Sequence, residues 1–330
     1  MDAVVDVILP AYNGSRVIHR AIESALVQEG VRRIFVVDDG STDDSATIAR
    51  SYGATVTVIT QTNRGVAGAR NTGLRASTAP FVAFLDQDDV WQRGKLKRQI
   101  QVLETHPEIG LVFSDIVVLT LEGTVLENGF LRDTPGYMRL SREPLGASAY
   151  RLSESIAAAL LPSSFIPPSS VMLRRAALDT VGGFDETFRL IDDADCWMRL
   201  LGKWRAAAIE ETLVHSFVWE QNASLLYMDK LVEERLKLGR KVAAAPALFP
   251  SGATAYFRRE ESVSLYRLGA LALERGDAAA ARRWFLSSVR SQARLKAMLG
   301  LAATCLDTRS RNALLELTRR VGLRWRIGVD

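Results

Sequence analysis

The sequence is poor in cysteine and histidine and has no long apolar segment. Its 330 residues include two cysteines, Cys196 and Cys305, and three histidines. Two distant cysteines outside any CxxC pattern argue against a disulfide framework and a cysteine-based zinc site, so we expect reduced thiols. No stretch reaches the ~18 uninterrupted apolar residues of a membrane span, and the first residues do not form a basic region followed by an apolar run. These absences predict a cytoplasmic protein.

Two common phosphate-binding motifs are also missing. The turn after the first apolar run, Pro10-Ala11-Tyr12-Asn13, has no GxGxxG pattern, and the chain has no GxxxxGK[ST] loop. A standard dinucleotide site and a P-loop are therefore not expected. Any phosphate charge would have to be met by a metal ion and by a basic side chain such as Arg70.

Charge is distributed unevenly along the chain. Residues 226–330 carry 20 Lys and Arg against 10 Asp and Glu, whereas residues 1–225 carry 22 against 28. A basic region can face nucleic acid, anionic lipid or water. It lacks the interleaved aromatic residues of RNA-binding segments, so we expect no nucleic-acid partner. An anionic membrane surface is kept as the candidate partner of this basic helical region, which would place the protein peripherally on the inner face of the membrane.

The most informative stretch is the apolar run Phe81 to Leu85 and the acidic turn behind it. Five apolar residues are too few for a helix and predict a strand buried on both faces. Asp86, Asp88 and Asp89 then follow within four residues. In a parallel α/β sheet, ligands bind outside the carboxyl ends of the strands. Crowded carboxylates there favour a divalent ion such as Mg or Mn, and the alternative is a solvated acidic turn.

Apolar runs alternate with helical patterns along the first two thirds of the chain. This alternation predicts an α/β fold with a mixed, mostly parallel sheet and flanking helices. Beyond about residue 225 the pattern is entirely helical and includes hairpins of the tetratricopeptide kind. We therefore expect two domains, residues 1–224 and 225–330. The predicted strands are 4–9, 34–37, 55–59, 81–85, 111–119, 169–173, 205–209 and 213–219.

Polar segments follow the ends of four of these predicted strands. They are Pro10 to Asn13, Asp38-Asp39, Asn63 to Gly65 and Asp86 to Asp88. Because the carboxyl ends of parallel strands meet at one edge of a sheet, we expect the four segments to converge and form a site. From about residue 127 to 168 periodicity fades, apart from a predicted helix 153–161, and such long irregular stretches often bind substrates.

Six motifs, in order, resemble the inverting family-2 glycosyltransferases of the GT-A fold. They cover roughly residues 4–220 and read VILPAYNG, FVVDDGSTDDS, NRGVAGARNTGL, FLDQDDVW, GGFDE and DDADCWMRL. The helical C-terminal region lies outside the resemblance. The resemblance implies transfer of a sugar from a nucleoside-diphosphate sugar to an acceptor hydroxyl, with inversion, in cell-surface polysaccharide or glycoconjugate synthesis. The acceptor would be a carbohydrate or a glycolipid.

The resemblance also implies roles for individual residues. Asp193 would be the catalytic base, and Asp88, with Asp86, would bind the metal that bridges the donor's phosphates. Asp192 and Trp197 would lie on the acceptor side. The implied donor-binding residues are Pro10, Tyr12, Asp39, Gly65, Arg70, Asp86 and Gly183.

Structural alternatives exist for several of these residues. Tyr12 and Trp197 could be core aromatics, and Arg70 could be a residue of a helix surface. Asp195 could be only the partner of Arg199, four positions on. Asp193 falls at a predicted helix start, where the macrodipole favours a negative charge and should keep the carboxylate ionised near neutral pH.

The sequence departs from the family pattern on the last predicted strand. Where the family often has Tyr-Arg-x-His, this chain has Ser216, Phe217, Val218 and Trp219, so a third protein ligand for the metal is not identified. One alternative function is a sugar-1-phosphate nucleotidylyltransferase, but the Gly- and Arg-rich loop of those enzymes is missing after the first strand. The other is a non-catalytic nucleotide-sugar-binding module, against which the intact Asp86, Asp88 and Asp193 argue.

Overall fold

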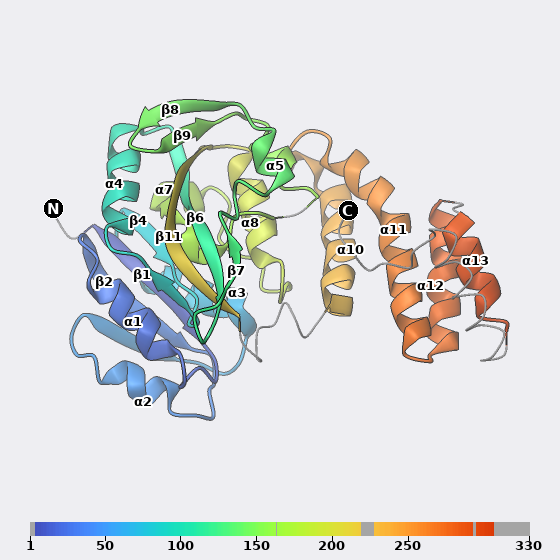
Figure 1. Ribbon diagram of the computed structural model, residues 1–330, viewed down its shortest axis with the longest axis horizontal. Coiled ribbons are helices and arrows are strands. Elements are labelled where there is room, and N and C mark those ends of the chain that lie inside the picture. Colours follow the sequence, from blue (N-terminus) through green and yellow to red (C-terminus); the bar gives the residue numbers. More distant parts are fainter. Residues whose placement is uncertain (1–3, 163, 219–227, 293–294, 307–330) are drawn as a thin grey trace. The chain divides into compact units, whose positions relative to one another are not determined.

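The computed structural model describes residues 4–162, 164–218, 228–292 and 295–306 (Figure 1). The chain divides into two compact units, the first made of residues 1–222 with 247–250 and the second of residues 223–246 with 251–330. The predicted boundary after residue 224 falls outside the described residues and stays a prediction.

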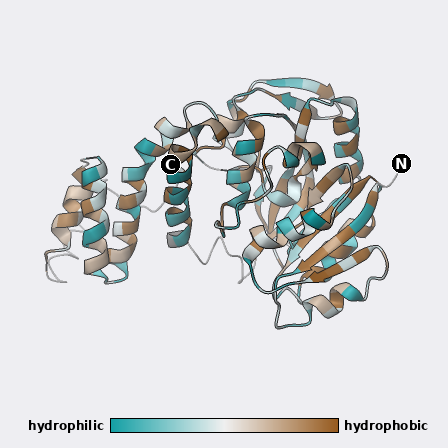
Figure 2. Cartoon of the chain, turned by 180° about the vertical axis from the view of Figure 1, so that it is seen from behind, coloured by the Kyte–Doolittle hydropathy of each residue, from teal (hydrophilic) through white to brown (hydrophobic). Residues whose placement is uncertain are grey.

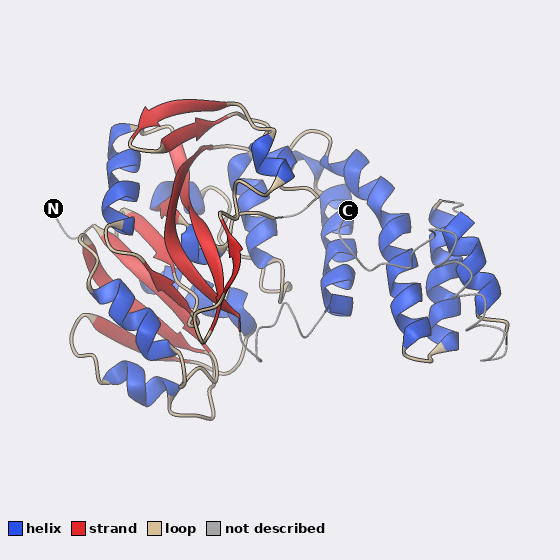
Figure 3. Ribbon diagram, in the orientation of Figure 1, coloured by secondary structure: helices blue, strands red, loops and turns tan. Residues whose placement is uncertain are grey.

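Unit 1 is built around one mixed β-sheet flanked by helices (Figure 3). The strand order among its described residues is β3-β2-β1-β4-β10-β6-β11-β9-β8, with β5 paired to β11 and β7 paired to β6. Strands β3, β2, β1 and β4 are parallel to one another, β6 is parallel to β11, and β10 is antiparallel to both β4 and β6. The predicted α/β class with a mixed sheet is confirmed.

The elements of unit 1 have the following bounds. The strands are β1 Val5–Ala11, β2 Val31–Asp38, β3 Val56–Thr60, β4 Phe81–Phe84, β5 Asp89–Trp91, β6 Ile109–Thr120, β7 Val125–Asn128, β8 Arg142–Gly146, β9 Ala149–Leu152, β10 Met172–Arg174 and β11 Arg205–Val218. The helices are α1 Ile18–Leu26, α2 Ser45–Arg50, α3 Gly65–Ala76, α4 Lys95–Thr105, α5 Pro135–Met138, α6 Ile156–Ala159, η1 Pro168–Ser170, α7 Arg175–Asp179 and α8 Asp192–Leu201.

The core of unit 1 follows from the apolar runs in the strands. Every residue of β1 is buried, as the continuous run in a central parallel strand predicts. Ile18 and Ile22 of α1 are fully buried and belong to the same core cluster as Val7 and Leu9 of β1. In Figure 2 the hydrophobic residues accordingly concentrate along the sheet, and the outer turns of the helices are more hydrophilic.

Three segments differ from the sequence-based expectation. The predicted strand 169–173 begins instead as the short helix η1, because Pro168 occupies its first turn, and β10 follows at Met172. The two predicted strands 205–209 and 213–219 form one strand, β11, whose register against β6 shifts between Ile209 and Val214. The predicted helix 153–161 is shortened to α6.

The hairpin β8–β9 lies in the stretch where the sequence showed no periodicity. Its turn uses Gly146, Ala147 and Ser148, all with positive φ angles of 93°, 45° and 59°. Ala and Ser rarely adopt this conformation, and the turn has no Asn-Gly or Asp-Gly pair of the kind that identifies hairpins in sequences. The hairpin could therefore not be predicted from these residues.

Unit 2 is helical in its described residues. It contains α10 Met228–Ala244, α11 Ala253–Glu274, α12 Ala278–Ser291 and α13 Leu295–Ala303, with η2 Pro246–Leu248 between the first two. Phe285 of α12 is fully buried, and a Cβ atom added to Gly269 of α11 or to Gly300 of α13 would lie 2.7 Å and 2.5 Å from its ring. The helices therefore approach each other closely at Gly269 and Gly300. Among the helices in the described part of the chain, none has the length and apolar character needed to cross a membrane.

Candidate active site

The loops after β1 and β4 are joined by a side-chain amide. Gln87 Oε1 accepts a hydrogen bond from the backbone N–H of Tyr12 (2.9 Å), and Gln87 Nε2 donates one to the backbone oxygen of Tyr12 (3.1 Å). The Tyr12 side chain is 48% exposed, so it is not a core aromatic. Pro10 is buried within β1, where it pairs with Val37 of β2. The loop after β1 therefore lies beside the Asp86–Asp89 turn, as the sequence predicts.

Asp39, after β2, binds the loop after β3. Its two carboxylate oxygens accept hydrogen bonds from the backbone N–H groups of Arg64 (2.8 Å) and Gly65 (2.7 Å) and from Gln61 Nε2 (2.6 Å). Gly65 has a φ of 79°, a backbone conformation that favours glycine, and a Cβ there would lie 1.9 Å from Nη1 at the flexible end of Arg189. Asp39 thus orders the N-terminal end of α3, and a carboxylate with three bonds keeps room for one more donor.

Arg70 of α3 connects the acidic turn to helix α8. Its guanidinium donates to Asp86 Oδ1 through Nη2 and to Asp192 Oδ2 through Nη1, both at 2.8 Å, and the residue is 3% exposed. Burial would lower the pKa of Arg70, but the charges of Asp86, Asp192 and Asp193 raise it, so the guanidinium stays charged. The surface-helix alternative is excluded, and Arg70 supports the acidic cluster.

The glycine turn between α7 and α8 is fixed against α3. Gly183 has a φ of 79°, and a Cβ there would lie 2.8 Å from Asn71 Oδ1. Asn71 accepts from the N–H of Phe184 (3.0 Å) and donates to the Phe184 oxygen (2.8 Å). Arg199 of α8 donates to the Gly183 oxygen at 2.9 Å. The turn is therefore held close to the middle of α3, and a donor contact of Gly183 stays a prediction.

Asp193 is the second residue of α8 and is partly exposed. Burial raises the pKa of its carboxyl to about 7, the Asp192 carboxylate adds to the rise, and the Arg70 guanidinium opposes it. The expectation that the helix dipole keeps this group fully ionised near neutral pH is therefore wrong, because burial and like charge outweigh the dipole. A carboxyl with this pKa is well matched to general-base work near neutral pH.

The two residues expected on the acceptor side are buried. Asp192 is 2% exposed and faces Arg70. Trp197 is 0% exposed, packs against Phe84 and Phe184, and donates from its indole N–H to the Ile166 oxygen at 3.0 Å. The structure places Trp197 in the core, which favours the structural alternative over contact with an acceptor.

The acidic turn brings three carboxyl groups close together. Asp86 and Asp88 are partly exposed, whereas Asp89 is 6% exposed. Burial, followed by the charges of Asp88 and Asp86, raises the pKa of Asp89 well above its ordinary value. Such crowding fits a cation. Within the described residues no group of three or more His, Cys, Asp or Glu side chains is arranged to hold a metal ion, so only an ion that takes most of its oxygens from phosphate fits this donor set.

The last strand offers no clear third ligand. His215 of β11 pairs with Val90 of β5, and burial followed by the Arg20 charge lowers its pKa. Ser216 pairs with Asp89 in the same ladder and hydrogen-bonds its carboxyl. Trp219 lies outside the described residues.

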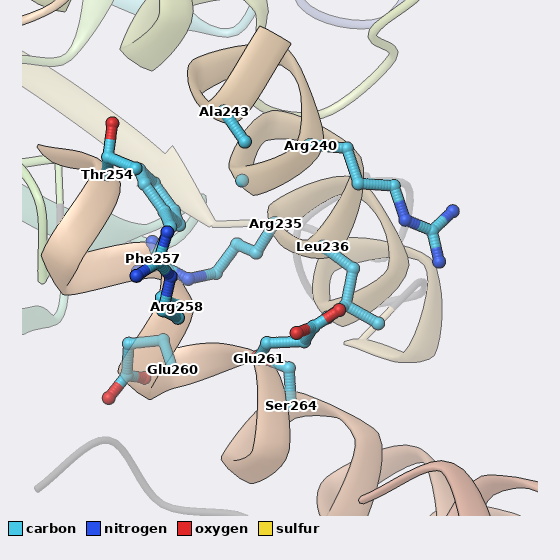
Figure 4. A pocket seen from close by; sticks show the side chains of 11 residues that line it. Arg235, Leu236, Arg240, Ala243, Thr254, Phe257, Arg258, Glu260, Glu261 and Ser264 are labelled. Atoms are coloured by element: carbon cyan, nitrogen blue, oxygen red, sulfur yellow. The ribbon is translucent and has the colours of Figure 1, made fainter. Parts of the chain in front are cut away.

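A pocket of about 140 Å³ lies in unit 2 between α10 and α11 and contains no predicted site residue (Figure 4). Arg235 points toward Phe257, with its guanidinium carbon 6.0 Å from the ring centre, whereas Arg240 points away from the pocket. Basic and acidic side chains both line it, so the pocket has no single charge preference. We assign it no role in the chemistry.

Several residues that hold the site together were not singled out from the sequence. Gln87, Gln61 and Asn71 are amides whose partners are backbone groups or side chains far along the chain. Ser169 of η1 accepts from the N–H of Asp86 at 2.9 Å and hydrogen-bonds Asp89. Sequence spacing alone gave no signal for these contacts, except that Gln87 stands between two predicted ligands.

Comparison with solved structures identifies the fold. A crystal structure of S. aureus TarS in complex with UDP-GlcNAc matches with a TM-score of 0.64 at 18% identity, covering 99% of this chain and 93% of that chain. The mannosyltransferase PcManGT from Pyrobaculum calidifontis, in complex with GDP-Man and Mn2+, matches with a TM-score of 0.57 at 20% identity, covering 98% and 81%. The fold is thus the GT-A fold of glycosyltransferases.

Sequence comparison identifies the family. The model described as glycosyl transferase family 2 matches residues 6–181, just over half of the chain. The chain therefore belongs to glycosyl transferase family 2, and the predicted resemblance is confirmed. The succinoglycan biosynthesis protein ExoU of Rhizobium meliloti is 29% identical over 272 residues, which cover 78% of this chain and 74% of ExoU.

The Asp195–Arg199 pair is a buried ion pair and not the surface pair that i,i+4 spacing suggests. Arg199 Nη2 lies 2.6 Å from Asp195 Oδ2, with side-chain exposures of 8% and 0%. Breaking a buried pair leaves an uncompensated charge, so Asp195→Asn should destabilise the protein by about 3–5 kcal/mol. The measurement is the free energy of unfolding in denaturant.

The chain provides a matched control for this variant. Arg175 and Asp179 have the same spacing at 2.9 Å, but their side chains are 31% and 60% exposed. Asp179→Asn should change stability by no more than about 0.5 kcal/mol. Equal effects of the two substitutions would show that burial does not determine the strength of the Asp195–Arg199 pair.

Proposed function

We propose that this protein transfers a sugar from a nucleoside-diphosphate sugar to an acceptor hydroxyl with inversion, in the synthesis of a surface polysaccharide or glycoconjugate. Family membership, the polysaccharide role in ExoU's name and the nucleotide sugar bound to TarS support the reaction class. The observation that carries the proposal is the Arg70 bridge, which joins Asp86 at the donor side to Asp192, next to Asp193.

The donor would lie over the edge where the four loops meet. Tyr12 offers an exposed ring and Asp39 a spare acceptor site for the nucleotide base, with Pro10 and Gly65 shaping the backbone around them. Asp86 would lie near the ribose, Asp88 near the diphosphate, and Gly183 near the donor sugar. Asp88 and Asp86 would hold a divalent cation, Mn or Mg, which would supply Lewis-acid stabilisation of the charge on the leaving diphosphate.

Asp193 would accept the proton of the acceptor hydroxyl as that oxygen attacks the anomeric carbon. One base and direct attack from the face opposite the leaving group account for inversion without a covalent enzyme intermediate. Asp192 would position this base, because Asp192 precedes Asp193 in the chain and is held by the same Arg70 guanidinium that holds Asp86. The acceptor, a carbohydrate or glycolipid, would approach over the exposed side of Asp193.

Asp193→Asn should lower kcat by ~10²–10⁴, because the amide keeps the shape but cannot accept a proton. The affinity for the nucleotide should stay within a few-fold. In the unmodified protein kcat/KM should fall tenfold per pH unit below an apparent pKa near 7, since burial and Asp192 raise the pKa of Asp193 to about 7 and its protonated form is inactive. Steady-state kinetics from pH 5 to 9 measure both effects.

Two results would contradict this assignment. One is an Asp193→Asn variant that keeps most of its turnover and still shows the same fall of kcat/KM below pH 7. The other is a product whose anomeric configuration, determined by NMR, is retained, because a single displacement by the acceptor must invert.

Metal removal should abolish transfer. EDTA and Asp88→Asn should each reduce activity below detection while leaving the far-UV circular dichroism spectrum unchanged, because the donor diphosphate would lose the cation that offsets its charge. Thermal shifts with UDP, dTDP and GDP sugars give a second readout, since a ligand at 100 times its Kd adds about 2.7 kcal/mol of stability. Full activity in EDTA would exclude a metal requirement.

We also propose that residues 225–330 form an accessory basic region that binds an anionic membrane surface, whereas residues 1–224 perform the chemistry. Each Lys or Arg near anionic lipid contributes about 1 kcal/mol, and salt screens the attraction. Arg282→Glu with Arg283→Glu should reduce co-sedimentation with phosphatidylserine vesicles and leave transfer to a soluble acceptor unchanged. Arg33→Glu with Arg50→Glu, both exposed in unit 1, is the matched control. Equal pelleting with neutral vesicles would contradict the proposal.

A further inference from the structure

Gln87 makes a two-way contact with one backbone unit. Its Oε1 accepts from the Tyr12 N–H at 2.9 Å, and its Nε2 donates to the Tyr12 oxygen at 3.1 Å. Of the side chains of this size, only an uncharged amide can both accept and donate in this way. A glutamate would keep the acceptor and place a carboxylate oxygen against the Tyr12 carbonyl. The contact is therefore specific for glutamine.

Gly14 makes room for this amide. A Cβ atom at Gly14 would lie 2.2 Å from Gln87 Oε1, 2.5 Å from its Cδ and 3.0 Å from its Nε2. Gly14 does not have a positive φ, so its backbone conformation does not require glycine. Glycine is needed at this position because a larger residue would occupy the space of the Gln87 amide.

The other side of the same loop is attached to the segment after β2. The N–H of Asn13 donates to Ser41 Oγ (3.0 Å), and Asn13 Oδ1 accepts from the Thr42 N–H (2.8 Å). Asn13 has a φ of 48°, which these bonds maintain. The loop after β1 is thus held from the β2 side by Ser41 and Thr42 and from the β4 side by Gln87, while the Tyr12 side chain is 48% exposed. This arrangement presents an exposed aromatic ring on a fixed backbone.

We infer that Gln87 is a positioning residue for the donor, which couples the Tyr12 ring to the Asp86–Asp88 turn so that base binding and diphosphate binding strengthen each other. The inference rests on the proposed function. Gln87 stands between the two carboxylates that would engage the cation and diphosphate, so fixing that turn fixes the amide and, through it, the backbone of Tyr12. By linkage, the factor by which an ordered Asp86–Asp88 turn strengthens base binding at Tyr12 equals the factor by which a bound base strengthens diphosphate binding at the turn.

The test uses three variants that disturb the contact in different ways. Gln87→Leu removes both hydrogen bonds, Gln87→Glu removes one, and Gly14→Ala displaces the amide without changing it. The ligand is whichever of UDP, dTDP, GDP and CDP binds the unmodified protein most tightly in the presence of Mn2+. Calorimetric titration should show about tenfold weaker binding of this nucleotide in each variant, equivalent to about 1.4 kcal/mol. In Gln87→Leu and Gly14→Ala, donor KM should rise similarly with kcat within a few-fold, and affinity for Mn2+ with inorganic pyrophosphate, which has no base, should stay within twofold. Gln87→Glu also adds a charge beside Asp86 and Asp88, so only its nucleotide affinity is compared. Gln101→Leu, at an exposed position on α4, is the control.

A double-mutant cycle with Tyr12→Ala separates coupling from a general loss of structure. Tyr12→Ala removes the ring but keeps the backbone that Gln87 binds, so Gln87→Leu should cost less than twofold in that background. A tenfold loss in both backgrounds, or an equal loss for pyrophosphate, would overturn the inference. Wild-type binding in all three variants would overturn it and leave the proposed function intact. Failure of the unmodified protein to bind any of the four nucleotides would overturn both.

Discussion

The site depends on one buried cation between two carboxylates that are distant in the sequence. Arg70 is 3% exposed and holds Asp86, 16 positions away, and Asp192, 122 positions away. A buried guanidinium without partners would cost several kcal/mol, so both carboxylates must be near it whenever the protein is folded. The folding of helix α3 into place therefore sets the distance between the turn after β4 and the start of α8. The proposed donor side and the proposed base are aligned by the same constraint.

The same cation sets the electrostatics of α8. Burial and the Asp192 charge raise the pKa of Asp193, while Arg70 limits the rise to about 7. The helix N-terminus also favours the ionised form, but its effect is typically 0.3–1 kcal/mol and is smaller than the combined effect of burial and a neighbouring carboxylate. The balance sets the pKa of Asp193, the proposed base, close to neutral pH, where the carboxylate would be able to accept a proton and still be ionised often enough to act. Arg70 would then contribute to reactivity as well as geometry.

The sequence predicts the framework of this site better than its details. Apolar runs identify the buried strands, and strands in a parallel sheet must end at a common edge, so the convergence of Tyr12, Asp39 and Asp86 could be deduced. Burial of individual side chains could not. Trp197 and Asp195 lie on a helix whose pattern is compatible with either exposure. Trp197 is inside because it packs against Phe84 and Phe184, and Asp195 is buried in its ion pair with Arg199. Asp193 was misjudged for the same reason, since desolvation depends on neighbours that spacing does not reveal.

The contacts missed from the sequence share a chemical property that explains their use here. Gln87 holds Tyr12, Gln61 connects Asp39 to Thr72, and Asn71 holds Phe184, and all three are uncharged amides. An amide can donate and accept at once, so it fixes a loop in position without adding charge. A carboxylate or ammonium group at these places would change the potential at Asp86, Asp88 and Asp193 and shift the pKa of the base. At these three places the loops are held by neutral groups, which add nothing to the charge that Arg70 and the carboxylates give the site.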